Sequence, residues 1–317
     1  MRNAMLMLIL PVPFIVGACS TASTENSPNV DRQQVINKGE SLSAMDTIHT
    51  TLPNIDYTHA SIIQYISFDQ RDIGEYTGEL FKEDFHSAWG RLDAPAVIES
   101  HGTNKQLTLL IPKDKIKKGM HGAIALSNHN TLHFSYKVRF KEDYDFRLGG
   151  KLPGLGGLNK NVDRSIYPTG CRSEGQKPDH GFSLRVMFRE QGKAVGYFYH
   201  QDNPNINNGR GNNNCGEDVP YQHKGDDFYF IPGQTYLIEQ SVTMNSPNES
   251  NGRVHVYING NRVLMRDNMV FSQTGQYGIN TILLDIWHGG SQDNWAPQVN
   301  SAITIDDFAL STEPLSY

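Results

Sequence analysis

Two polar positions, Ser183 and Arg185, alternate with apolar residues in the run 182–189, and Met187 and Arg189 continue the same alternation. Alternate side chains of a strand share a face, so we expect both on the face opposite the apolar one. A three-residue turn at 190–192 would close a hairpin that places Tyr197 opposite Arg185. The same register places Tyr199 opposite Ser183. Such a group could bind an acidic sugar, with arginine on the carboxylate and tyrosines for the ring and for proton transfer. A solvated face with aromatic–cation pairs is the alternative.

Lys151 is a second candidate, because it lies in a segment that is rich in glycine. Residues 147–157 hold five glycines and Pro153 around this lysine. We predict a tight turn after a strand. A lysine held in such a turn could be placed there for its charge, or it could be an ordinary exposed turn residue.

The elements that position these residues are predicted to be short strands. Residues 132–140 alternate strictly, and 254–258 precede the hairpin dipeptide Asn259–Gly260. Residues 282–287 and 302–305 predict late strands, and no amphipathic helix of useful length is expected. Many short strands separated by turn residues predict an all-β fold, a sandwich of two antiparallel sheets.

The composition excludes several classes of protein. With 10% aromatic and 20% charged residues, the chain is not expected to be disordered. Its formal net charge is −6, so the chain lacks the excess of basic residues that is typical of a nucleic-acid binder. A polyanionic partner would need positive charge gathered locally.

The first residues predict export. A short apolar stretch after Arg2 describes a signal peptide over 1–18, and Val16–Cys19 resembles the bacterial lipobox. Cys19 would then be lipidated and anchor the chain to a membrane, with Ser20 favouring the outer membrane. An ordinary signal with a chance cysteine is the alternative. Residues 19–58 are polar and predict a flexible tether, and 59–317 form one domain.

Export also bears on the two remaining cysteines. Oxidising conditions predict a disulfide between Cys171 and Cys215. The loop before Cys215 is rich in asparagine and carries Arg210. It lacks the alternating carboxylates of a calcium loop, so we predict no metal there.

Taken together, these motifs resemble polysaccharide lyase family 14, whose members are alginate and glucuronan lyases on a β-jelly-roll sandwich. The resemblance spans about residues 130–310 and uses the motifs Gly150–Gly157, Ser183-x-Arg185, Tyr197-x-Tyr199, Gly289–Ser291, Trp295–Pro297 and Asp306–Phe308. Gly156 departs from the family pattern, which usually carries tyrosine there. The fold implied is a jelly-roll β-sandwich.

The resemblance implies β-elimination on a uronic acid. A base removes the C5 proton, the C6 carboxylate is neutralised, and an acid protonates the departing O4. The implied catalytic residues are Lys151, Ser183, Arg185, Tyr197 and Tyr199. Ser183 and Arg185 would bind the carboxylate. One tyrosine, in the first place Tyr199, would be acid, base or both, and Lys151 would take the proton or stabilise developing charge. Clustered cations are expected to lower the pKa of both groups, which predicts an alkaline optimum.

Further residues are expected to bind substrate, namely Lys137, Arg139, His180, Arg210 and Trp287. Lys137 and Arg139 could extend a basic groove, or they could lie on a solvated face. We expect poly-mannuronate as the substrate of a monomeric enzyme without a cofactor. A glucuronan-specific lyase and a non-catalytic carbohydrate-binding sandwich are the alternatives. A glycoside hydrolase would need two flanking carboxylates, which no strand supplies on one face.

Overall fold

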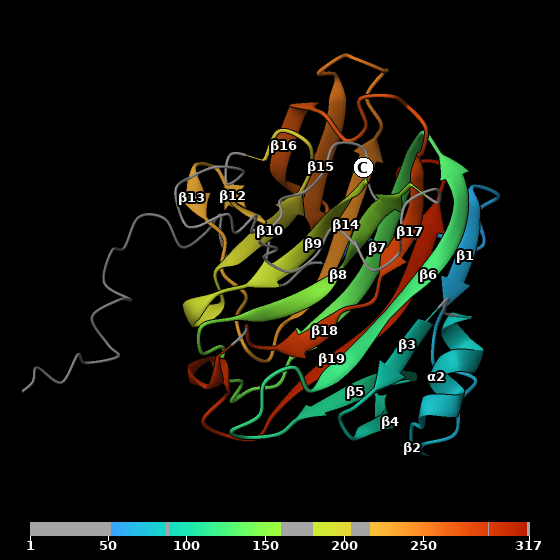
Figure 1. Ribbon diagram of the computed structural model, residues 1–317. Coiled ribbons are helices and arrows are strands. Elements are labelled where there is room, and N and C mark those ends of the chain that lie inside the picture. The colour runs from blue at the N-terminus through green and yellow to red at the C-terminus, as the bar shows by residue number, and fades with distance from the viewer. Residues whose placement is uncertain (1–51, 87–88, 160–179, 204–215, 291, 316–317) are drawn as a thin grey trace, which may run out of the picture. The chain divides into compact units, whose positions relative to one another are not determined.

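Strands form most of the described part of the chain, which comprises residues 52–86, 89–159, 180–203, 216–290 and 292–315 of a computed structural model. They build two antiparallel sheets that pack as a sandwich, as the sequence predicts (Figure 1). The division into a signal peptide, a tether and one domain stays a prediction, because residues 1–51 lie outside the described part. Within that part, no helix is long and apolar enough to cross a membrane.

The larger sheet has nine strands. Their spatial order is β16 (Asn261–Met269), β15 (Gly252–Ile258), β14 (Thr235–Thr243), β7 (Thr131–Phe140), β19 (Ser301–Ser311), β5 (Asn104–Ile111), β4 (Ala96–His101) and β2 (Gly74–Glu75), and β1 (Ile62–Ile66) also pairs with β19.

The smaller sheet has eight strands and carries the candidate residues. Their order is β11 (Glu217–Pro220), β10 (Ala194–Tyr199), β9 (Gly181–Phe188), β8 (Gly150–Leu158), β17 (Ile279–Leu283), β6 (Gly119–His129) and β18 (Ile286–His288), and β3 (Trp89–Leu92) pairs with β6. Strand β18 also pairs with β8. The remaining elements are the pair β12 (Gln222–His223) and β13 (Asp226–Asp227), helix α2 (Gly78–Phe85), and 3₁₀ turns at Glu190–Gly192 and Asp293–Trp295.

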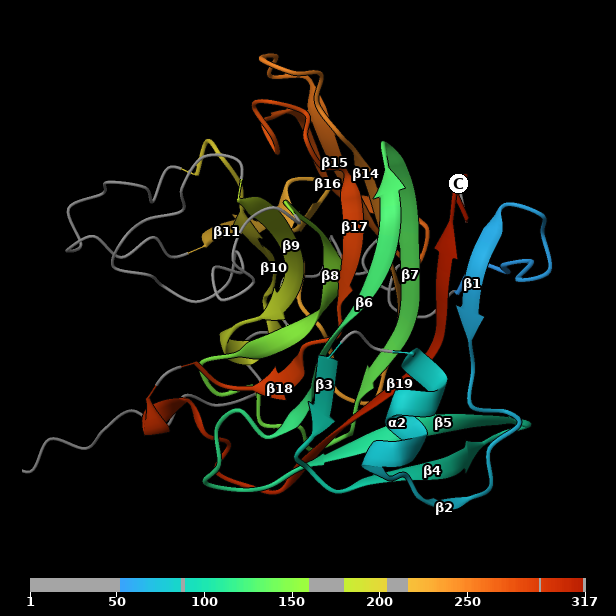
Figure 2. The ribbon, with the colours of Figure 1, turned by 45° about the vertical axis from the view of Figure 1, so that its right-hand side comes forward.

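The short helix α2 was not expected from the sequence. Its N-cap Thr77 accepts a hydrogen bond from the Leu80 amide at 3.3 Å, which satisfies one of the free amides of the first turn. Phe81 and Phe85 face the core, and the Phe85 ring lies edge-on to Phe308 at 5.2 Å. The helix lies beside β3 in both views (Figure 2). Eight residues are too few to show a helical period in the sequence.

Apolar residues of the two sheets meet between them and form the core. Leu184 and Val186 of β9 are fully buried there, as are Tyr136 and Val138 of β7. Their neighbours in sequence therefore point to the two outer faces of the sandwich. The outer face of the eight-stranded sheet holds the candidate site, and the outer face of the nine-stranded sheet holds a different set of polar residues.

A bulge at Pro153 is supported by side chains from the opposite sheet. The pairing of β8 with β9 shifts register between Leu152 and Gly154, which interrupts the ladder. Tyr136 donates to the Pro153 carbonyl at 3.2 Å, and Gln240 accepts from the Leu155 amide at 3.0 Å. These groups cross the core and satisfy backbone atoms that the bulge removes from the ladder. Strand β8 is therefore fixed at the point next to Lys151.

The outer face of the nine-stranded sheet contains a carboxyl group, Asp306, that is only 2% exposed. Burial, and then the neighbouring Asp307, raise its pKa to about 7. The folded protein keeps the Asp306 proton at pH values where the unfolded chain has lost it. The free energy of unfolding therefore falls as pH rises from about 4 to about 7. If the whole pKa shift of Asp306 appears as unfolding free energy, this loss amounts to about 4 kcal/mol. We expect Asp306→Asn to raise the free energy of unfolding at pH 8 by up to this amount and to leave it unchanged at pH 4.

Denaturant unfolding at the two pH values measures this effect. Asp114→Asn is the matched control, because Asp114 is exposed and lies 4.0 Å from Lys113, so its loss should leave the free energy of unfolding nearly unchanged at both pH values. Equal stability of Asp306→Asn and the parent protein at pH 8 would contradict the expectation.

Candidate active site

Three adjacent strands bring the candidate residues together on the outer face of the eight-stranded sheet. Tyr197 lies opposite Arg185, and Tyr199 lies opposite Ser183, in the pairing of β10 with β9. The register predicted for this hairpin is thus confirmed, together with the turn at 190–192, where Gly192 adopts a φ of 87°. Strand β8 follows on the other side of β9 and carries Lys151 (Figure 1).

The glycine-rich segment is a strand and not the tight turn that we expected. Residues Gly150–Leu158 form β8, with Lys151 opposite Met187 on one side and opposite Trp287 on the other. Its glycines allow neighbouring backbones to approach closely. A Cβ atom on Gly154 would lie 2.1 Å from the Leu184 carbonyl oxygen. A glycine-rich run can be a strand where close backbone approach requires it.

Lys151 is buried and has no carboxylate partner within the described part of the chain. Its Nζ lies 2.6 Å from Met187 Sδ and 4.1 Å from the centroid of the Tyr197 ring. Burial, and then the positive charges of Arg185 and Arg189, hold the pKa of Lys151 well below its ordinary value. The sequence analysis expected a lowered pKa for Lys151, and the structure gives this direction, with burial as the main cause. A neutral amine can accept a proton.

The two tyrosines contact each other. Tyr199 donates from its hydroxyl to that of Tyr197 at 3.4 Å, and the rings are perpendicular with centroids 5.4 Å apart. Burial, and then Tyr197, raise the pKa of Tyr199, although Arg185 acts in the opposite sense. The expectation of a lowered pKa for this tyrosine was wrong, because removal of the phenolate from water outweighs the effect of the nearby Arg185 charge. Tyr199 is a protonated phenol.

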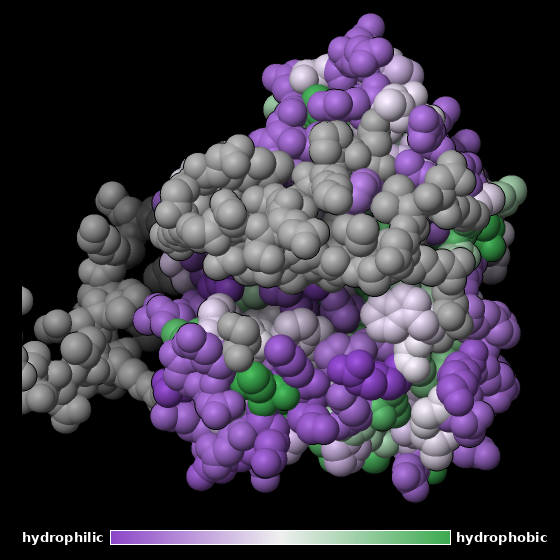
Figure 3. Space-filling model, viewed as in Figure 1, coloured by the Kyte–Doolittle hydropathy of each residue, from purple (hydrophilic) through white to green (hydrophobic). Residues whose placement is uncertain are grey.

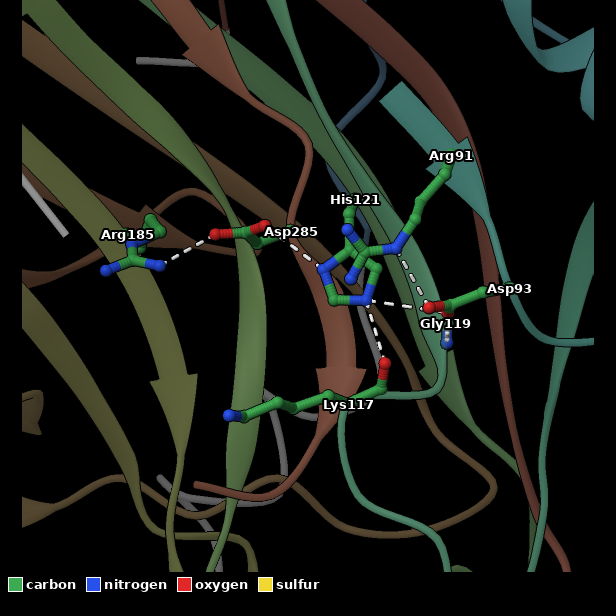
Figure 4. Close-up of polar contacts among 7 residues, drawn as sticks. All are labelled: Arg91, Asp93, Lys117, Gly119, His121, Arg185 and Asp285. Atoms are coloured by element: carbon green, nitrogen blue, oxygen red, sulfur yellow. Dashed lines mark hydrogen bonds and ion pairs between the residues drawn. The ribbon is translucent and has the colours of Figure 1, made fainter. Parts of the chain in front are cut away.

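Arg185 forms a buried ion pair that the sequence analysis did not foresee. Its Nη1 donates to Asp285 Oδ2 at 2.7 Å, and its side chain is 3% exposed (Figure 4). Burial alone would raise the pKa of Asp285, but His121 and Arg185 outweigh it and lower the pKa to about 2. Asp285 is therefore a carboxylate. Arg185 Nε is buried without a hydrogen-bond partner among the described residues, so the ion pair leaves this donor unsatisfied.

A second arginine completes the charged surroundings of Lys151. Arg189 follows Arg185 on the same face and donates to Asp218 Oδ2 at 2.7 Å. Its guanidinium lies 5.5 Å from the Tyr197 ring centroid. Arg189 and Met187 were visible in the alternation of residues 182–189 but were given no role. The only sequence feature that distinguishes Asp285 is that it is the one acidic residue in the apolar run 282–287.

The other predicted binding residues fall in different places. Trp287 is at the site, half-buried, with its ring centroid 5.6 Å from Lys151 Nζ. His180 immediately precedes β9, where its carbonyl accepts from the Asn159 amide. Ser183 is fully buried in β9.

Lys137 and Arg139 do not extend the candidate site. Both lie on β7 of the nine-stranded sheet and point to its outer face, on the opposite side of the sandwich. Lys137 pairs with Asp307, and Arg139 pairs with Glu142. The expectation of a continuous basic groove was wrong, because the two outer faces of a sandwich have the same alternating pattern in sequence.

Four of the predicted site residues lie outside the described part of the chain, namely Cys19, Cys171, Arg210 and Cys215. The described surface seen from the side of Figure 1 is mainly hydrophilic, with small separate hydrophobic patches (Figure 3).

Comparison with known proteins agrees with this arrangement. The family model described as Polysaccharide lyase 14 matches residues 114–308. Among solved structures, the alginate lyase Aly36B matches with a TM-score of 0.63 and 21% identity, over 80% of this chain and 98% of that chain. None of the curated proteins matches.

Two further alginate lyases share the fold. The marine enzyme from Aplysia kurodai matches with a TM-score of 0.63 and 20% identity, over 80% of this chain and all of that chain (100%). The enzyme vAL-1 from Chlorella virus matches with a TM-score of 0.59 and 15% identity, over 81% of this chain and 100% of that chain. The family match covers more than half of the chain and includes the strands that carry Lys151, Arg185 and Tyr199. The chain therefore belongs to polysaccharide lyase family 14, and it is a carbon–oxygen lyase of the alginate lyase type that acts on uronate polymers.

Proposed function

We propose that this lyase cleaves alginate, with poly-mannuronate as the preferred polymer, at the outer face of the eight-stranded sheet. The observation that carries the proposal is the buried Lys151, whose pKa is well below its ordinary value and which lies beside Arg185 and two tyrosines. The relatives support alginate as the polymer. Aly36B was solved as a lysine-and-tyrosine variant with an alginate tetrasaccharide, and as a lysine-and-methionine variant with a trisaccharide.

The first step is removal of the C5 proton of a uronate. Arg185 and Ser183 bind the C6 carboxylate, and Arg185 offers it the guanidinium nitrogen that does not bind Asp285. Neutralising that carboxylate makes the C5 proton more acidic. The Lys151 amine takes the proton. Burial favours the neutral amine, and so it can act as a base below the ordinary lysine pKa.

The second step is departure of O4. The electrons of the C5–H bond form the C4–C5 double bond, the C4–O4 bond breaks, and O4 takes up a proton. The Lys151 ammonium formed in the first step is a stronger acid than the Tyr199 phenol, because the pKa of the lysine is lowered and that of the tyrosine is raised. Lys151 therefore returns the proton to O4, and the tyrosine hydroxyls donate hydrogen bonds to the reacting sugar. An alkaline optimum stays a prediction.

The location of the enzyme is a separate proposal that depends on the first residues. A lipidated Cys19 would hold the lyase at the outer membrane on the tether of residues 19–58. The Cys171–Cys215 disulfide would then form in the same oxidising compartment. Both follow from the sequence alone.

A panel of uronate polymers tests the substrate. Each cleavage leaves an unsaturated uronate, whose conjugated double bond absorbs near the ultraviolet edge. We expect the fastest rise in absorbance on poly-mannuronate, a slower one on poly-guluronate and glucuronan, and none on uncharged mannan. A fastest rise on glucuronan would make the enzyme a glucuronan lyase. No rise on any uronate polymer would indicate a carbohydrate-binding protein and would contradict the proposal.

A further inference from the structure

Arg185 reaches its partner across a neighbouring strand. It lies on β9, and Asp285 lies at the junction of β17 and β18, with β8 between them. The residue of β8 opposite Arg185 is Gly154, which has no side chain to block the crossing. Figure 4 shows the guanidinium directed at the Asp285 carboxylate, with another of its nitrogens on the far side. The ion pair therefore determines where the remaining donors of Arg185 lie.

His121 lies on the opposite side of Asp285. Strands β17 and β18 both pair with β6, and the register is the same in the two pairings. This register places Asp285 opposite His121. The imidazole Nδ1 lies 3.8 Å from Asp285 Oδ1, and Nε2 lies 2.9 Å from the Lys117 carbonyl oxygen. A carbonyl only accepts, so Nε2 donates to it, and Nδ1 attracts the Asp285 carboxylate when it carries a proton as well. The ring is also stacked on Trp287, with centroids 5.6 Å apart, and is 7% exposed.

We infer that Asp285 and His121 are positioning residues of the lyase reaction, in which Asp285 holds the Arg185 guanidinium over β8 and His121 holds Asp285. The inference rests on the proposed function, since it assumes that Arg185 binds the substrate carboxylate. Neither residue needs to touch the substrate. His121 Nε2 lies 3.5 Å from Asp93, which binds Arg91, so the network continues to the edge of the sheet (Figure 4).

Asp285 also affects the proton acceptor. Among the described residues, the groups that face Lys151 are Arg185 on β9, Arg189 immediately after it, Tyr197 on β10, Asp218 on β11, Asp285, and Trp287 on β18. The two arginines lower the pKa of Lys151, and the two aspartates raise it. Loss of the Asp285 charge would therefore lower this pKa further. A merely structural residue would not change it.

Asp285→Asn tests the inference through two measurements on the most active uronate polymer. We expect kcat/KM to fall by about 100-fold, mainly through KM, because Arg185 is displaced from its position. We also expect the ascending limb of the pH profile of kcat/KM to move to lower pH. Asp218→Asn is the matched control, since it removes an equivalent charge whose partner is Arg189. It should move the limb in the same direction and leave KM within about twofold.

Two variants of His121 separate its contacts. His121→Asn keeps an amide donor near the place of Nδ1, facing Asp285, whereas His121→Gln keeps one near the place of Nε2, facing Lys117. If the function of His121 is to support Asp285, His121→Asn should retain most of the activity. His121→Gln should lose about 10-fold in kcat/KM. This pair decides the question if Asp285→Asn does not fold, which thermal unfolding would show.

An unchanged KM and an unmoved limb in Asp285→Asn would overturn the inference, and so would better activity of His121→Gln than of His121→Asn. These outcomes are distinct from failure of the proposed function. If the parent protein yields no unsaturated product from any uronate polymer, the proposed function is wrong, and the inference is overturned with it. If the parent protein is active and the variants match it, only the inference is wrong.

Discussion

Replacing Lys151 by methionine is expected to lower kcat/KM on poly-mannuronate by about 10³-fold, because the variant loses the group that takes and returns the proton. Methionine fills a similar volume and places no charge or polar atom in a buried position next to Met187. Folding should therefore be retained, and the thermal midpoint should equal or exceed that of the parent protein. Absorbance of the unsaturated product measures the rate, and a thermal scan measures stability.

Lys151→Arg distinguishes a base from a simple positive charge. A guanidinium remains protonated at every accessible pH, so it can stabilise negative charge but cannot accept the C5 proton. We expect this variant to be as inactive as Lys151→Met. Lys193→Met serves as the control, because Lys193 lies just before β10 and pairs with Asp227, away from the proposed machinery. More than a tenth of the parent activity in Lys151→Arg would assign Lys151 an electrostatic role and leave the base to another group.

Replacing Arg185 by glutamine is expected to reduce both activity and stability. The carboxylate of the substrate loses its charged partner, which should lower kcat/KM by about 10² to 10³-fold. Asp285 is left as a buried carboxylate without its ion pair, which should cost about 3–5 kcal/mol of unfolding free energy. The two losses are measured by product absorbance and by denaturant unfolding at neutral pH.

The double variant Arg185→Gln/Asp285→Asn separates these two effects. It removes the unpaired charge, so most of the lost stability should return, because no uncompensated carboxylate remains buried. Activity should not return, since no cation is restored to the carboxylate site. Recovery of activity in the double variant would contradict the role of Arg185, and an additive loss of stability would contradict a buried charge pair.

The part of the site that lies within one hairpin could be predicted from the sequence. Alternation places Ser183 and Arg185 on one face, and a three-residue turn determines their partners on β10. Both are local properties, because the period of a strand is two and a short turn leaves one register. The family resemblance added Lys151, and the structure places it on the adjacent strand.

The parts of the site that join distant segments could not be predicted. Asp285 lies 100 residues from Arg185, and nothing in its surroundings in sequence names a partner. The glycines of 149–157 suggested a turn, since no local signal distinguishes a flexible turn from a strand that needs close backbone contact. The net charge of −6 likewise gave no indication that Lys151, Arg185 and Arg189 gather on one face.

The sequence by itself determined that the chain is an all-β sandwich, which residues share a face within a strand, and the register of the hairpin that carries both tyrosines. Only the tertiary structure decided that Lys137 and Arg139 lie on the other sheet, and that Lys151 and Tyr199 have pKa values displaced in opposite directions. The physical reason is that alternation and turn chemistry act over a few residues. Burial and charge pairing depend on which strands become neighbours, and that is set by packing across the whole core.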